Sequence, residues 1–514
     1  MPSDPSPSSS PAEFPGRDAV ARFRGELVAT VPLHPLERAL VIIAGLQLCM
    51  MPWVLGSMHP PAQFVAFGLA LTAFVVSLIT RNYDGEYTRE GEFRLVMWRR
   101  LVRFPIFWIG LIFFAYIALQ GANPFWKATV YPNGGYHTDP LENYIAWLPA
   151  GVEAPFMKMN AWRMLIIYGG AWLLACALWV GLSRRQAVQQ VLTIIVVNAA
   201  LIGLIAFLQR ATGTREVLWL VKGKAQFFVG SFIYKNHAGA FFNMALACAL
   251  ALGLWHYRRA ARRMSRSSPA PLFGLCAFVL AVVVVITYSR AATLLMIAYL
   301  AVAGVVLWIG WLRTPASGRN VGGMLMLVTM FVVAAAAGGY VLRFDKAVTR
   351  MEQALVALRE GEGPSVTDRK ISTRATFDMA QERLWTGWGS GSFRWVFPIF
   401  QKNYPEIWWV DQRPVRRSQA TRFWLDAHND YAQLLAELGV IGFAIGGSLL
   451  FAGVFLVVRS GGLGNPPVLL LVGGLALPLI HSWADNHSTN PAILCTFSAV
   501  LILAGRWSEL EARR

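Results

Sequence analysis

Charged residues are scarce in this sequence. Asp, Glu, Lys and Arg make up only 14% of its 514 residues, against roughly 25% in an average soluble domain, while 56% are hydrophobic. The hydrophobic residues are gathered into long blocks and are not spread at amphipathic spacing. This deficit of charge excludes an ordinary soluble globular protein and indicates an integral membrane protein with many spans.

Ionisable residues are almost missing from the middle of the apolar blocks, where Glu437 is the main exception. Transporters and proton pumps usually carry such groups along their pathway. The first half of the chain is also not repeated in the second half, as it is in many transporters. Both absences count against a transport function.

Paired cysteines and a secretory leader are absent as well. All five cysteines lie inside apolar blocks and none is in a CxxC pair, so we expect small buried hydrophobes that identify no compartment. The first 38 residues are polar and rich in Pro and Ser, without the apolar core and cleavage site of a signal peptide. We therefore expect residues 1–37 to form a disordered cytoplasmic tail.

The apolar blocks are long enough to cross a membrane, which takes about 20 residues in a helix. Twelve such blocks predict an all-α integral membrane protein with about 12 transmembrane helices. The predicted spans are 38–58, 61–80, 104–121, 161–182, 187–208, 237–256, 271–288, 291–312, 323–343, 429–458, 468–484 and 491–506.

The net charge of +18 arises mainly from arginines at the ends of these spans, so it predicts an orientation and not nucleic-acid binding. With the N-terminus inside, the inner connections carry clusters of arginine such as 258–266, whereas the outer connections at 58–61 and 484–490 carry no Lys or Arg. We predict that both termini are cytoplasmic. Spans 1–9 then occupy 38–343, a long, partly helical loop on the outer side occupies 344–428, and spans 10–12 with a short cytoplasmic tail occupy 429–514.

This topology places four polar segments together at the outer face. The first is GSFIYKNH at 230–237, where Lys235 and the adjacent helix start could hold an anion. The second is Tyr288-Ser289-Arg290, in the tight turn between spans seven and eight. For Lys235 and Arg290 alike, the alternative is a cation that reaches along the helix to lipid headgroups.

The third polar segment lies in the long loop. It follows an amphipathic helix predicted at 345–360 and contains Arg374 and GWGSGSF at 387–393. The glycine pattern is not framed by a strand and a helix and faces away from the cytoplasm, so it predicts a tight turn and not a nucleotide site. Trp388 and the many tryptophans around it suit membrane anchoring and sugar rings alike.

The fourth polar segment, DAHNDY at 426–431, lies where the long loop becomes span ten. A histidine side chain can take or give a proton near neutrality, so His428 is a candidate general base, although a residue that merely begins a helix is the alternative. Glu437 would lie roughly 13 Å deeper in that helix, paired with backbone or with another polar group. His481, Asp485 and His487 form a weaker cluster nearby, which we do not interpret as a metal site.

In this order, the motifs resemble those of the O-antigen ligase and O-antigen polymerase superfamily of bacterial membrane glycosyltransferases. HNDYAQLLAELGVIG is similar to its histidine motif, GSFIYKNHAG to its Gly–Phe–Asn–Arg–Asn–His motif, and YSR to its Ser–Arg–Gly turn. Arg374 with GWGSGSF, and HSWADNHSTNPA, resemble two further family elements. The resemblance runs from about 230 to 500, with Lys235 where the family often has Arg and Ala291 where it has Gly.

The resemblance implies an enzyme of the bacterial inner membrane that transfers a glycan from an undecaprenyl diphosphate carrier at the periplasmic face, without metal or cofactor. It implies that Arg290 and Arg374 grip the diphosphate and that His428 activates the acceptor hydroxyl. The acceptor would be a glycan, lipid A-core or a protein. We expect the substrate to be bound by Lys235, Asn236, Trp388, Asn429 and Asp430.

Three functions stay open at this point. The first is a lipid-linked glycan transferase acting as ligase or polymerase, and the second is a protein O-oligosaccharyltransferase. The third is a non-enzymatic carrier such as a lipid-linked-glycan transporter, which would need charged groups along a transbilayer path that the sequence does not show.

Overall fold

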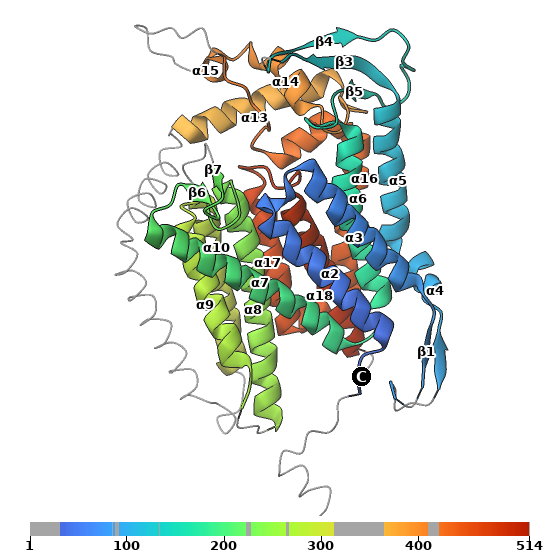
Figure 1. Cartoon of the computed structure of the whole chain (residues 1–514), viewed down its shortest axis with the longest axis vertical. Coiled ribbons are helices and arrows are strands. Elements are labelled where there is room, and N and C mark those ends of the chain that lie inside the picture. Colours follow the sequence, from blue (N-terminus) through green and yellow to red (C-terminus); the bar gives the residue numbers. More distant parts are fainter. Residues whose placement is uncertain are drawn as a thin grey trace, which may run out of the picture.

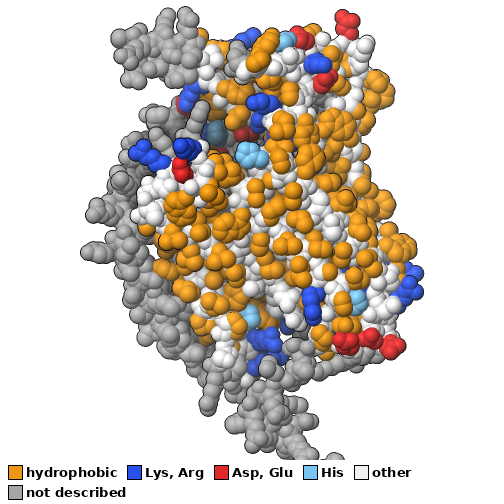
Figure 2. All heavy atoms as spheres, viewed as in Figure 1, with side chains coloured by type: hydrophobic (Ala, Val, Ile, Leu, Met, Phe, Trp, Pro, Cys, Tyr) orange, Lys and Arg blue, Asp and Glu red, His pale blue; other side chains and the backbone are white. Residues whose placement is uncertain are grey.

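The computed structural model describes residues 31–84, 86–87, 92–132, 134–222, 228–263, 267–312, 364–409 and 421–512. Long helices form a bundle, and smaller elements cover one of its ends (Figure 1). Space-filling atoms in Figure 2 show hydrophobic side chains over the middle of the visible face and most charged ones near its two ends. This distribution matches a bundle whose sides face lipid.

The long helices coincide with the spans predicted from hydropathy. Eight are long and apolar enough to cross a membrane, and three apolar helices in the described part of the chain are shorter. The eight are α2 (Pro35–Trp53), α3 (Pro60–Leu78), α5 (Pro105–Ala122), α6 (Ala161–Gly181), α7 (Arg185–Thr212), α8 (Lys235–Arg263), α16 (Asp430–Arg459) and α18 (Pro491–Ala512). The shorter ones are α9 (Ala270–Ile286), α17 (Pro466–His481) and the apolar stretch Arg290–Val305 of α10 (Arg290–Leu312).

The multi-pass membrane fold predicted from the sequence is therefore confirmed. Eleven of the twelve predicted spans fall on these helices, and the twelfth, at 323–343, lies outside the described residues together with the amphipathic helix predicted at 345–360. Several helices begin with proline, as at Pro60 and Pro105, because the first helical residue needs no backbone donor.

The helices differ in how much of their surface they bury. In their most apolar stretch, 83% of the residues of α8 are buried, as are 78% for α6 and 72% for α18, against 28% for α16 and 33% for α3 and α5. The first three helices therefore form the centre of the bundle. The others present more apolar surface, which lipid would cover.

One end of the bundle carries a cap, which we define as residues 124–153 together with 364–409. The first part is a three-stranded sheet in which β3 (Pro124–Val130) pairs with β4 (Tyr136–Pro140) in antiparallel and with β5 (Gly151–Glu153) in parallel orientation. The second part contains α13 (Pro364–Glu382), α14 (Phe393–Gln401) and α15 (Pro405–Trp408). The two parts share one aromatic core, which includes Phe125, Trp388 and Phe400.

Short elements complete the fold. A two-stranded sheet pairs β1 (Arg81–Tyr83) with β2 (Phe93–Leu95) ahead of α4 (Trp98–Val102), and another pairs β6 (Glu216–Val217) with β7 (Val221–Lys222). Single 3-10 turns follow α2 at Leu55–Ser57 and precede α17 at Gly462–Gly464. These elements join helices at the two ends of the bundle and leave its apolar core unbroken.

Candidate active site

The polar segments predicted to meet do so at the capped end, around the loop 482–490 that joins α17 to α18. Asp430, the first residue of α16, holds this loop. Its buried carboxylate accepts hydrogen bonds from the Ser482 hydroxyl (2.7 Å), the His487 N–H (2.8 Å) and the Ser488 hydroxyl (2.6 Å). Since these bonds occupy most of its acceptor capacity, the carboxylate fixes the loop, and this geometry does not favour the substrate contact predicted for it.

Asp485 lies at the centre of the constellation, with a fully buried side chain. The Tyr234 hydroxyl donates to it, at 2.9 Å from Oδ2 and 3.1 Å from Oδ1, and the Asn236 side-chain amide donates to Oδ2. The Asn486 N–H also donates to Oδ1 (2.9 Å). Tyr234 and Asn236 flank Lys235 at the start of α8, so the first polar segment and the 482–490 loop form one site.

Two cationic or titratable side chains complete this cluster. Nδ1 of His428 lies 3.1 Å from Oδ1 of Asp485, and a guanidinium nitrogen of Arg369 lies 3.5 Å from Oδ2. Arg369 also donates to the Ala484 carbonyl (2.5 Å) and to the Tyr234 hydroxyl (3.4 Å). One buried anion is thus in contact with both an imidazole and a guanidinium.

The charge state of Asp485 decides the tautomer of His428. Burial by itself raises the pKa of Asp485, but the hydrogen bond with His428 and the charge of Arg369 hold that pKa well below its usual range. An ionised carboxylate can only accept hydrogen bonds, so Nδ1 of His428 carries the proton. In the neutral imidazole the lone pair is then on Nε2, which is the arrangement a general base requires.

The backbone presents His428 at the surface of the site. Its φ is +53°, in the left-handed region, and the following Asn429 caps α16 by accepting the Ala432 N–H at 3.1 Å. The side chain of His428 is 32% exposed, whereas that of its partner Asp485 is buried. Among the described residues no hydrogen-bond partner is recorded for its Nε2, so this atom is available to a substrate.

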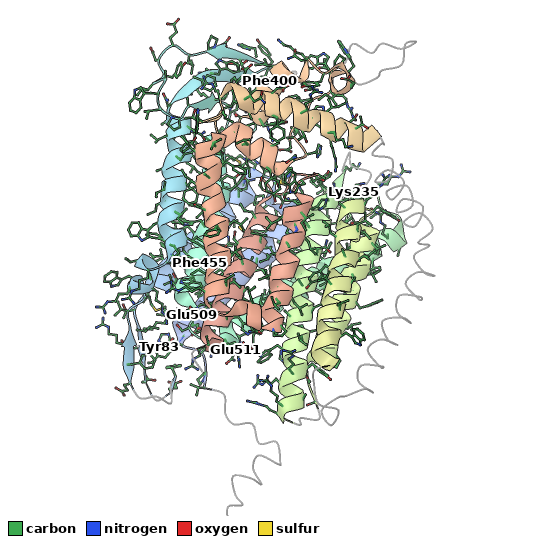
Figure 3. The ribbon with its side chains drawn as sticks, turned by 180° about the vertical axis from the view of Figure 1, so that it is seen from behind. Tyr83, Lys235, Phe400, Phe455, Glu509 and Glu511 are labelled. Carbon is green, nitrogen blue, oxygen red and sulfur yellow. The ribbon has the colours of Figure 1, made fainter. Side chains whose placement is uncertain are left out.

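The predicted cations lie at the same end of the protein but not all in this cluster. Lys235 begins α8 and Arg290 begins α10, and the first turns of these helices touch, because a Cβ on Gly239 would meet that of Ala292 at 2.4 Å. Figure 3 shows Lys235 nearer to the capped end than to the end that carries Glu509 and Glu511.

Arg374 is exposed on α13. It interacts with the Tyr404 hydroxyl, which donates to Asp378 on the same helix. Arg369, five residues earlier, takes the position beside Asp485. The sequence analysis did not select Arg369, and it gave Asp485 only a minor place. The role predicted for Arg374 in binding the diphosphate stays a prediction.

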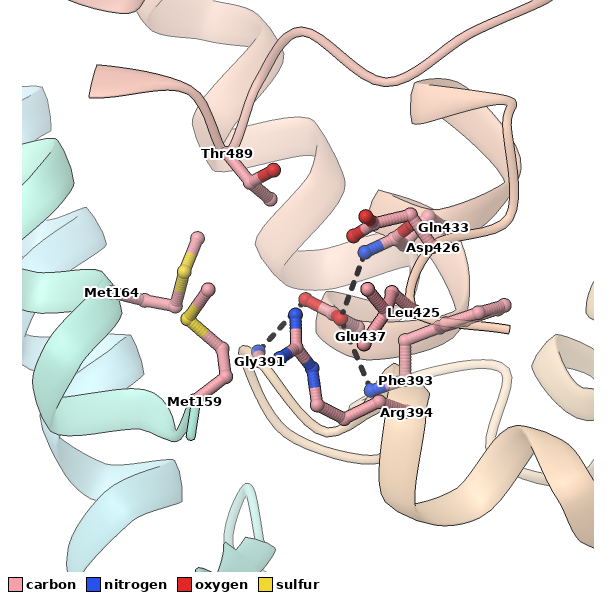
Figure 4. Close-up of a pocket in the computed structure, with 10 residues that line it drawn as sticks. All are labelled: Met159, Met164, Gly391, Phe393, Arg394, Leu425, Asp426, Gln433, Glu437 and Thr489. Atoms are coloured by element: carbon pink, nitrogen blue, oxygen red, sulfur yellow. Dashed lines mark hydrogen bonds between the residues drawn. The ribbon is translucent and has the colours of Figure 1, made fainter. Parts of the chain in front are cut away.

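The glycine-rich turn at 387–393 docks on a break in α16. Gly439 has φ +64° and ψ −179°, and the Trp388 and Gly389 N–H groups donate to the Ala436 and Glu437 carbonyls (3.0 and 2.8 Å). The buried Glu437 carboxylate accepts the N–H groups of Gly391 (2.8 Å) and Phe393 (3.2 Å), as Figure 4 shows. Glu437 is therefore paired with backbone, as predicted, but the helix is not continuous beyond it.

Glu437 also lines a small pocket beside the His428 cluster. Figure 4 shows Glu437 with Asp426, Arg394 and Thr489 around the same space. Met164 on α6 and Met159, just before that helix, also line this pocket. Gln433 links the pocket to the segment that carries His428, because its side-chain oxygen accepts the Ala427 N–H at 2.9 Å.

Trp388 lies in the core of the cap and is only 5% exposed. Its indole N–H donates to the Met379 carbonyl (2.7 Å), and its ring packs against Phe125, Trp126 and Phe400. The predicted contact between Trp388 and substrate is therefore not favoured by this packing. The ring stabilises the cap instead.

The imidazole rings of His481 and His487 pack against each other, with their centroids 4.5 Å apart, and both interact electrostatically with Asp485. Burial lowers the pKa of His487, so this imidazole is neutral and does not add positive charge to the site. In the part of the chain that the structure describes, no group of three or more His, Cys, Asp or Glu side chains is placed to hold a metal ion.

Fold and site together define a multi-pass membrane protein with a histidine–aspartate–arginine cluster at one end of its helical bundle. Residues 275–446 match the sequence model of a family described as O-antigen ligase, which confirms the resemblance to the O-antigen ligase-like superfamily. No curated protein matches the chain significantly. The matched region contains Arg290, Arg369 and His428, while Tyr234 and Asp485 lie outside it.

Proposed function

We propose that this protein is a glycosyltransferase that moves a glycan from a polyprenyl diphosphate carrier to an acceptor hydroxyl, as an O-antigen ligase or a surface-polysaccharide polymerase. The family match supports glycan transfer in a membrane as the class of activity. The observation that carries the proposal is the contact of His428 with buried Asp485, with Arg369 3.5 Å from the same carboxylate. We place this site at the periplasmic face of the inner membrane, with both termini cytoplasmic.

The proposed reaction is a single displacement at the anomeric carbon of the carrier-linked sugar. The acceptor oxygen attacks this carbon, the bond from carbon to the diphosphate oxygen breaks, and polyprenyl diphosphate leaves with the electron pair. The acceptor proton passes to Nε2 of His428, while Asp485 stabilises the imidazolium that forms. Charge that develops on the diphosphate is stabilised by Arg369, whose side chain is 29% exposed, and by Arg290 and Lys235 at the neighbouring helix starts.

Substitution of His428 tests the proposal. His428→Ala should lower glycan transfer on the order of 10²–10⁴-fold, which is the usual contribution of a general base. His428→Gln keeps a hydrogen-bonding group but cannot take the proton, so it should be almost as inactive. The assay is transfer of a radiolabelled polyprenyl-diphosphate-linked glycan by the purified protein in nanodiscs, with His256→Gln, on a distant part of α8, as the histidine control.

The activities of the two His428 variants distinguish a general base from a residue that only positions the acceptor. If His428→Gln keeps most of the activity, the histidine only positions the acceptor and the general-base mechanism fails. If His428→Ala transfers glycan normally, the proposed site itself is wrong. The products of a deletion strain identify the acceptor: polymer left on its carrier indicates a ligase, single units without polymer indicate a polymerase, and loss of glycopeptides indicates a protein acceptor.

A further inference from the structure

Tyr234 lies between the two opposite charges of the site. Its hydroxyl accepts hydrogen bonds from the side-chain amide of Asn236 (2.8 Å) and from the guanidinium of Arg369 (3.4 Å). With its lone pairs engaged in this way, the hydroxyl directs its own proton to the Asp485 carboxylate, 2.9 Å away. Neither the sequence motif nor the proposed reaction assigns this phenol a role.

The environment keeps the phenol protonated. Burial, and then the charge of Asp485, raise the pKa of Tyr234 well above its ordinary value. Tyr234 is therefore a constant donor to Asp485 over the whole range in which a histidine titrates. The same carboxylate receives Nδ1–H of His428 on its other oxygen.

We propose that Tyr234 is a positioning residue that acts on His428 through Asp485, an inference that rests on the proposed function. The Tyr234 hydroxyl and Nδ1–H of His428 compete for the charge of one carboxylate. A strong bond from Tyr234 weakens the attraction of Asp485 for the imidazolium form, because shared negative charge stabilises each donor less. Tyr234 thus lowers the pH at which His428 becomes able to accept a proton.

Other charged or titratable groups also face His428, and they are present in every variant compared below. His237 at the start of α8 interacts electrostatically with His428 itself, and Asp426, on the segment of His428, interacts with His237. Arg369 from α13 and His487 from the loop 482–490 act on Asp485, the partner of His428. Because none of these groups changes in Tyr234→Phe, a shift in that variant reports the loss of one hydroxyl.

The test measures the protonation of His428 without glycan transfer. Diethylpyrocarbonate modifies histidine only in its neutral form, and peptide mass spectrometry gives the rate at His428 as a function of pH in nanodiscs. Tyr234→Phe should move the midpoint of this profile upward by roughly half a unit to one unit. This is about half of the effect of a lost hydrogen bond to a charged group, because the change reaches His428 only through Asp485. In an Asp485→Asn background, Tyr234→Phe should produce no shift, because the connection between the two residues is gone.

Two further variants of this protein serve as an independent test and as a control. Incorporation of 3,5-difluorotyrosine at position 234 keeps the ring and makes the hydroxyl a stronger donor, so the midpoint should move downward, even if Tyr234→Phe proves unstable. Tyr299→Phe removes a buried hydroxyl that donates to the Leu470 carbonyl (2.9 Å) and not to Asp485, so it should leave the midpoint in place.

An unchanged or lowered midpoint in a folded Tyr234→Phe protein overturns the inference, as does an unchanged midpoint with difluorotyrosine. A shift that persists in the Asp485→Asn background shows that Tyr234 does not act through Asp485, and it overturns the inference too. Failure of the wild-type protein to transfer glycan would refute the proposed function instead, since the modification profile requires only the folded protein.

Discussion

Replacement of Asp485 by Asn probes the part of the site that the sequence indicates least. The side chain keeps its size, so the loop 482–490 should stay in place. The negative charge is lost, however, and with it the acceptor that holds the proton on Nδ1 of His428 at 3.1 Å. An amide can turn its NH₂ group toward Nδ1, which favours the tautomer that has the proton on Nε2. His428 then has no lone pair to offer the acceptor hydroxyl.

The expected loss of activity has two contributions. A hydrogen bond to a charged group is worth about 1.5–3 kcal/mol, which corresponds to roughly 10- to 150-fold in rate at 1.36 kcal/mol per factor of ten. The wrong tautomer adds to this loss, so we expect a decrease in kcat on the order of 10²–10³-fold. KM for the donor should change much less, because Arg369 keeps its bonds to Ala484 and Tyr234.

The assay is the pH dependence of glycan transfer in nanodiscs, with thermal unfolding of the same samples as the control. Since the imidazolium loses its anion, the acidic limb of the rate profile should also move to lower pH. The folded-state pKa of Asp485 is depressed, so the carboxylate stabilises the wild-type fold at neutral pH, and this contribution is lost as the pH falls below about 4. A folded Asp485→Asn enzyme with activity within threefold of wild type would refute the reasoning.

The remaining predictions concern the donor, the fold and the topology. Arg369→Gln should raise KM for the lipid-linked donor at least about tenfold, whereas Arg374→Gln should change it less; equal effects in a kinetic titration would reverse this order. Gly439→Ala should lower the free energy of unfolding by about 1–3 kcal/mol, because φ is +64° and the new Cβ would lie 2.4 Å from the Trp385 carbonyl oxygen. Gly447→Ala on the same helix, with open space around it, should be neutral in the same melting assay. A cysteine at Trp147, which is 81% exposed, should react with an impermeant reagent on spheroplasts, and protection there would contradict the orientation.

The spans could be predicted from sequence because their signal is local. A run of about 20 apolar residues specifies a membrane helix without reference to any other part of the chain. Counting the spans between them places the segments around 235, 290 and 428 at the same end of the bundle. The contact of Asn236 with the 482–490 loop is consistent with that count. The side of the membrane on which they meet stays a prediction.

The choice between Arg369 and Arg374 could not be made in this way. Five residues along a helix correspond to a rotation of about 500°, so the two guanidinium groups point about 140° apart. Only the packing of α13 against α16, α14 and α15 decides which of them faces Asp485. The sheet at 124–153 also escaped prediction, since its strands are short and its partners, such as the Arg394 carbonyl that accepts the Tyr136 hydroxyl, lie 258 residues away.

The composite cap sets a limit on exchanging parts between related proteins. A transplant of the region 275–446 would carry His428 and the glycine-rich turn but would leave behind the strand bearing Phe125, on which Trp388 packs. It would also separate His428 from Asp485 and Tyr234, which lie on either side of that region. Recombinants with breakpoints at its edges should thus be defective even when each segment comes from an active enzyme. Functional chimeras would have to inherit the strands, the start of α8 and the α17–α18 loop from one parent.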